Sequence, residues 1–222
     1  MQSRNCFRLI FQIIAMLVVL VPAIVLAGGR GVLLLGDEPT QIIWQDHGTI
    51  RIDESDDEYL VVRDNTPYMV TEENGKLSVI DLSGMAEFLA EFGGELTNNP
   101  YNWGKMNAFR ETGSRETVAG IEGNVYAVTL KDPNGQTESL EAVLTDDRQV
   151  VELMQRYATT LQTAFDVSEV SDLLAELPKD QRGVLRFGRY LRLKSISSDE
   201  PEDDLFEFRA EPVSFGDWIQ EN

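Results

Sequence analysis

The chain has 222 residues, of which 19 are Lys or Arg and 38 are Asp or Glu, so its formal net charge at pH 7 is -19. This length fits one sizeable domain or two small ones, and 42% hydrophobic residues is a globular rather than a disordered composition. The charge argues against direct nucleic-acid binding, while a single Cys and a single His exclude an intrachain disulfide framework, a Cys-based zinc site and a multi-His metal centre.

Residues 1–27 are typical of an export segment. Arg4 and Arg8 precede an apolar run over 9–26, and small residues lead to a cleavage site after Ala27. The run is also long enough to span a bilayer, so an uncleaved signal anchor is the alternative. In both cases the positive residues keep the N-terminus in the cytoplasm and the remainder is exported. We therefore expect a periplasmic protein, held at the inner membrane if the segment is retained.

The exported part begins with a Gly-punctuated stretch, 28–40, that we interpret as a linker, and residues 41–222 are expected to form a single domain. Period-two patterns predict short strands in this domain, with Asn74-Gly75 as a hairpin turn and Ala119-Gly120 as the turn of a longer strand pair over 115–131. The other predicted strands are 41–45, 48–52, 59–63, 68–71, 76–80, 138–144, 184–196 and 205–210.

Helical periodicity appears in three places, at 83–92, 146–165 and 168–177. The second is the clearest, with an apolar stripe along one face and Asp146 as a candidate N-cap. Strands with inserted helices predict an α+β fold: a curved antiparallel sheet or half-barrel of about eight to ten strands, covered on one face by the helical insertion 146–177.

The 115–144 region carries a family resemblance. Residues 116–120 (ETVAG), 125–128 (VYAV) and 132–135 (DPNG) resemble a bacterial periplasmic family of unknown function with a V-A-G-x-x-x-x-V-Y-x-V hairpin, and residues 68–85 are similar to the same family. The resemblance implies an architecture like that of the envelope lipoprotein carriers (LolA/LolB-like), a half-barrel closed by helices over an apolar concavity. Many members carry a Cys near the position of Gly123, which this chain lacks.

The stripe of the 146–165 helix has two interpretations. It is either core that packs on the sheet, or a lid whose side chains touch an apolar guest in a groove. Two aromatic residues of a polar loop would line the mouth of that groove or, alternatively, fill it. The candidate ligand-binding residues are Met154, Tyr157, Leu161 and Phe165 from the helix, and Tyr101 and Trp103 from the loop.

Catalytic and metal chemistry have little support in the sequence. His47, the single His, precedes Gly48 in a predicted turn, and no Gly-x-Ser-x-Gly motif is present. Two acidic clusters, 53–58 and 199–204, are rich in the oxygen ligands that Ca²⁺ prefers, but neither matches a calcium-binding loop. We expect no metal site and no cofactor. The carboxylates considered for Ca²⁺ are Asp53, Asp56, Asp57, Asp203 and Asp204.

These patterns favour a non-enzymatic binding or chaperone-like module of the cell envelope, with an apolar ligand or an envelope protein as its partner. The alternative is a structural or interaction protein with a filled core. An enzyme ranks last, because the sequence offers no paired nucleophile and base.

Overall fold

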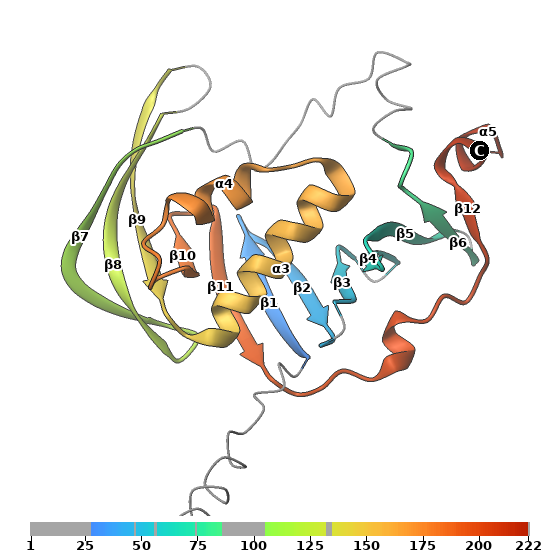
Figure 1. Ribbon diagram of the computed structural model, residues 1–222, viewed down its shortest axis with the longest axis horizontal. Helices are drawn as coiled ribbons and strands as arrows, with labels where there is room; N and C mark the ends of the chain where they lie inside the picture. The colour runs from blue at the N-terminus through green and yellow to red at the C-terminus, as the bar shows by residue number, and fades with distance from the viewer. Residues whose placement is uncertain are drawn as a thin grey trace, which may run out of the picture.

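The structure, a computed structural model, describes residues 28–46, 48–55, 57–73, 75–85, 105–131 and 135–221. Its described strands form one sheet of twelve, in the order β12-β6-β5-β4-β3-β2-β1-β11-β10-β9-β8-β7. Neighbours pair antiparallel except β12, which runs parallel to β6. The sheet is curved and carries helices on one face (Figure 1), so the α+β prediction is confirmed. The strands are β1 (Gly29–Leu35), β2 (Glu38–Trp44), β3 (Ile50–Asp53), β4 (Glu58–Arg63), β5 (Thr66–Glu73), β6 (Lys76–Asp81), β7 (Lys105–Val118), β8 (Ile121–Lys131), β9 (Thr137–Thr145), β10 (Gly183–Phe187), β11 (Leu191–Ser197) and β12 (Pro212–Ser214).

The helix α3 (Arg148–Phe165) lies across the sheet, as Figure 1 shows, and is followed by α4 (Glu169–Glu176). Both helices were predicted from their apolar periodicity. The N-cap, however, is Asp147 and not Asp146: the Asp147 side chain accepts hydrogen bonds from the backbone N–H groups of Gln149 (3.1 Å) and Val150 (3.2 Å). The predicted helix 83–92 lies outside the described residues except at its start.

The linker predicted at 28–40 is wrong, because this stretch contains β1 and the beginning of β2. β1 lies in the middle of the sheet, between β2 and β11, with Leu33 fully buried. Its glycines allow close packing: a Cβ on Gly31 would lie 2.7 Å from Cδ2 of Leu153 on α3. Repeated glycine, which predicted a linker, occurs here in a strand against which a helix packs closely.

The sheet curls strongly at its β7 end. A bulge in β7 between Glu111 and Arg115 contains Gly113, whose φ is +79°. Glu116 of β7 accepts hydrogen bonds from Arg186 of β10, at 3.2 Å from Nε and 2.6 Å from a terminal nitrogen, although β8 and β9 separate these strands in the sheet order. The curl therefore brings the outermost described strand back toward the middle of the sheet.

The other face of the sheet is covered near β3 and β4 by the segment between β11 and β12. Residues 205–210 do not form the strand predicted there. They contain the end of a 3₁₀ turn, η1 (Asp203–Phe206), with Phe206 buried. Arg51 donates to the carbonyl of Leu205 (2.9 Å) and Arg63 donates to the carbonyl of Phe206, so guanidinium groups satisfy the backbone in place of a neighbouring strand. The short helix α5 (Phe215–Glu221) then follows β12.

Candidate functional site

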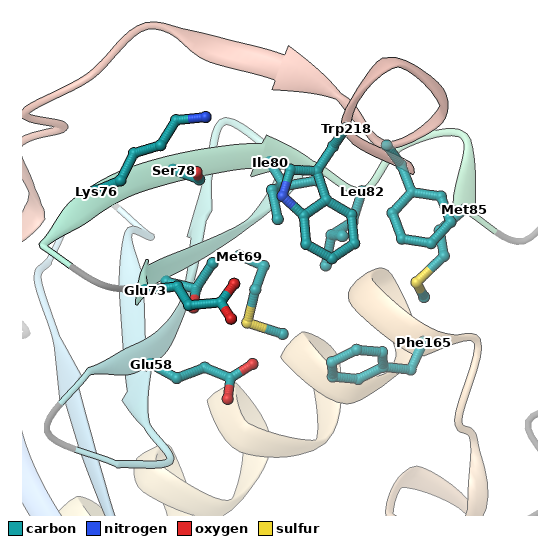
Figure 2. Close-up of a pocket in the computed structure, with 12 residues that line it drawn as sticks. Glu58, Met69, Glu73, Lys76, Ser78, Ile80, Leu82, Met85, Phe165 and Trp218 are labelled. Atoms are coloured by element: carbon teal, nitrogen blue, oxygen red, sulfur yellow. The ribbon is translucent and has the colours of Figure 1, made fainter. Parts of the chain in front are cut away.

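A cavity of about 550 Å³ opens between the β5–β6 hairpin, the C-terminal end of α3 and the helix α5 (Figure 2). This volume lies within the usual range for small-molecule sites, about 300–1,000 Å³. Its lining is mainly apolar, with a few polar and charged groups. The lining residues are Glu58, Met69, Thr71, Glu73, Lys76, Ser78, Ile80, Leu82, Met85, Phe165, Phe215 and Trp218.

The floor of the cavity is one face of the β4–β5–β6 sheet, and its polarity changes in steps along the strands. Met69 pairs with Ile80 in an apolar row. The next row on the same face is Glu58, Thr71 and Ser78, and the last is Glu73 with Lys76. Because alternate residues of a strand share a face, these three rows form a gradient from an apolar end to a charged end.

The walls come from segments that are distant in the sequence. Phe165 is the last residue of α3, and Phe215 and Trp218 belong to α5, with ring centroids 6.3 Å apart. β12 places α5 there by pairing with β6, where Val213 is opposite Ile80. The hydroxyl of Ser214 accepts a hydrogen bond from the Asp217 backbone N–H (3.1 Å), which fixes the first turn of α5.

Of the aromatic and methionine residues that line the cavity, Phe165 alone was among the predicted ligand-binding residues. Met154, Tyr157 and Leu161 lie instead in the main core under α3, with 0%, 1% and 3% of their surface exposed. The stripe of α3 is therefore core along most of its length, and only the side chain at its C-terminal end reaches the cavity. Tyr101 and Trp103 lie outside the described residues. Phe215 and Trp218 are three residues apart near the C-terminus, a spacing that places both side chains on one face of a helix. This spacing could have predicted the aromatic wall of the cavity from the sequence.

Four of the five carboxylates considered for Ca²⁺ are engaged elsewhere or exposed. Asp53 forms an ion pair with Arg51 (2.5 Å), and Asp203 accepts a hydrogen bond from the side-chain amide of Gln45 (2.7 Å). Asp57 and Asp204 are exposed. Within the described part of the chain, no three His, Cys, Asp or Glu residues gather as metal ligands. Asp56 and His47 lie outside it.

A second hollow, of about 590 Å³, lies over the outer face of α3, and its lining is mostly charged. Arg148, Lys179 and Arg182 line it together with acidic residues, and Arg156 is already paired with Glu152 at 2.8 Å. This mixture of charges, with Val151 as the one apolar side chain among the described lining residues, is typical of a solvated helix surface. The cavity beside α5 is the better candidate for a ligand site, since it combines apolar walls with a few polar groups.

In the described residues we find no helix with the length and apolar character needed to cross a bilayer. No protein-family model, curated protein or solved structure matches the chain.

Proposed function

We propose that the protein is an exported, non-enzymatic binding module of the bacterial envelope that holds an apolar ligand in the cavity beside α5. The observation that carries this proposal is the cavity itself, of about 550 Å³, with Met69 in its floor and Phe165 and Trp218 in its walls, all three only half-buried. Methionine and aromatic side chains adapt to apolar ligands of varied shape.

The sequence supports the export part of this proposal. Residues 1–27 have the charge and hydropathy pattern of a signal peptide or anchor, and the 116–128 region resembles a periplasmic family with half-barrel architecture. The strong curl from β10 to β7 agrees with such an architecture, as does the helix packed on the sheet. The closeness to envelope lipoprotein carriers is an analogy of fold, which by itself does not fix the ligand.

The alternative of a structural protein with a filled core is supported in the middle of the molecule, where Met154, Tyr157 and Leu161 are buried under α3. It does not account for the cavity at the end of that helix. An enzyme is the least favoured function, because the described residues that line the cavity include no His or Cys that could act as a base or thiol nucleophile.

A fluorescent apolar dye tests the proposal. N-phenyl-1-naphthylamine should bind the full chain saturably, and Trp218→Ala should weaken that binding about tenfold, because an indole covering about 60 Å² of ligand contributes about 1.5 kcal/mol. Ile219→Ala is the matched control, since Ile219 is the next residue of α5, is 39% exposed and does not line the cavity. The apolar N-terminal segment is the same in all three proteins, so any dye that it binds contributes equally to the three measurements.

Equal dye affinity in wild type and Trp218→Ala would show that the cavity is not the binding site. Native mass spectrometry of the protein from its own envelope gives an independent test. A copurifying apolar ligand that is lost from Trp218→Ala, but kept by Ile219→Ala, supports the proposal. A clean apo mass together with no saturable dye binding refutes it.

A further inference from the structure

We infer that the ligand of this cavity is a cationic amphiphile, an apolar chain or ring system that ends in an ammonium or guanidinium group. This inference rests on the proposed function and adds the chemistry of the ligand's head group. It follows from where the structure places charge within the cavity.

The apolar and charged ends of the cavity are separate. Phe165, Trp218 and Met85 form one end, and Figure 2 shows their side chains gathered on one side of the cavity. The carboxylates of Glu58 and Glu73 are at the other end and turn toward the cavity from β4 and β5. A ligand that fills the space must therefore be apolar at one end and polar at the other.

The polar end has an excess of negative charge. Glu58 is half-buried and Glu73 is exposed. Among the described lining residues the one cation is Lys76, which extends along the outer rim of β6 in Figure 2. Lys76 can compensate one of the two carboxylates, which leaves one negative charge for a ligand to meet. The hydroxyls of Thr71 and Ser78, in the row between, can accept further hydrogen bonds from an ammonium or guanidinium group.

The electrostatic field of the whole protein also favours a positively charged ligand. With a net charge of -19, the chain raises the local concentration of cations and repels anionic amphiphiles. An anionic head placed at Glu58 would also desolvate a like-charged carboxylate, which is unfavourable. The inference therefore commits to a cation and excludes a fatty acid or an anionic lipid as the preferred occupant.

Three amphiphiles with the same chain test the sign of the head group. Dodecylamine, dodecanol and dodecanoate are used, below their micelle-forming concentrations, to displace N-phenyl-1-naphthylamine from the full chain. We expect dodecylamine to displace the dye at a concentration at least about tenfold lower than dodecanol does, with dodecanoate weakest. The preference for the amine should shrink as NaCl is raised, because salt screens the partly exposed charges.

Charge variants identify the residues responsible. Glu58→Gln and Glu73→Gln should each lower the preference for dodecylamine over dodecanol several-fold, while leaving dodecanol unchanged. Glu72→Gln is the matched control: it alters the net charge equally, but Glu72 is exposed on the opposite face of β5 and does not line the cavity. Lys76→Gln should increase the preference.

The possible failures are distinguishable. If all three amphiphiles displace the dye equally, or dodecanoate is best, the cationic head group is refuted while the apolar site stands. If Glu72→Gln lowers the preference as much as Glu58→Gln does, the selectivity comes from the general charge of the protein and the inference is refuted. If the dye does not bind saturably, the proposed function itself fails.

Discussion

Gly123 in β8 allows a direct test of how the curled end of the sheet is packed. It is buried, and a Cβ built on it would lie 2.6 Å from the carbonyl oxygen of Leu144 and 2.8 Å from both Leu185 Cδ1 and Val143 Cγ1. The nearest of these atoms belongs to the backbone of β9, which is held by its pairing with β8. Gly123→Ala therefore forces β8 and β9 apart or displaces two core side chains.

The magnitude follows from two opposing effects. Forcing an extra methyl group into a packed core costs about 1–3 kcal/mol. Replacing glycine also lowers the conformational entropy of the unfolded chain, which stabilises the folded state by about 0.4–1 kcal/mol and partly offsets this cost. We expect a net loss of about 1–2 kcal/mol in the free energy of unfolding, and a melting temperature lower by about 2–8 °C for a protein of this size. Gly123→Cys should cost more, since it adds a sulfur atom to the same space.

Urea unfolding followed by far-UV circular dichroism measures this loss. Gly84→Ala is the control: a Cβ at Gly84 would meet no atom within 4 Å, and its backbone is not in the left-handed region. This variant should be neutral or slightly stabilising. An unfolding midpoint for Gly123→Ala equal to or above that of wild type would refute the packing argument.

Three further predictions concern a cap, an ion pair and the segment that covers the second face. Asp147→Ala should lower the free energy of unfolding by about 1 kcal/mol because α3 loses its N-cap, whereas Asp146→Ala should change it by less than about 0.5 kcal/mol; equal losses in chemical denaturation would contradict the cap assignment. Hydrogen bonds from Arg186 lower the pKa of Glu116, so the stabilisation from this pair is fully present above the ordinary Glu pKa, about 4.3, and is lost as the pH falls through the lower folded-state pKa. Arg186→Met should therefore cost about 1 kcal/mol at pH 7 and progressively less as the pH is lowered below the ordinary Glu pKa, and a cost independent of pH would rule out this origin. Phe206→Ala should destabilise the protein by about 3 kcal/mol and speed tryptic cleavage at the exposed Arg209, read by mass spectrometry; unchanged cleavage would mean that Phe206 does not hold the segment in place.

The sequence alone determined those helices, strands and turns that depend only on residues close together along the chain. The apolar stripe of 146–165 predicts α3, and the Ala119-Gly120 turn, with φ of 51° and 82°, joins β7 and β8 as expected. The predicted strands 59–63 and 68–71 correspond to β4 and β5, but both strands extend beyond the predicted bounds and include Glu58 and Glu73. Such signals depend on side-chain direction along a single element, which the backbone repeat fixes.

The tertiary structure alone decided which of these faces is covered and by what. The sequence predicts a linker at 28–40, because repeated glycine obscures the alternation of apolar and polar residues that marks a strand. In the structure, glycine is required at position 31 of β1 because Leu153 of α3 packs directly on it. The sequence predicts a strand at 205–210, but Arg51 and Arg63, which come from distant strands, donate hydrogen bonds to the carbonyls of Leu205 and Phe206 instead.

The cavity depends on the same long-range contacts. Phe165, Trp218 and Met69 come from three separate parts of the chain, and they meet only because β12 pairs with β6 and places α5 beside the end of α3. Pairing between distant segments is set by the packing of the whole core rather than by the residues next to each strand. The sequence could therefore predict the character of each side chain, while the fold determined that an apolar end and an acidic end share one cavity.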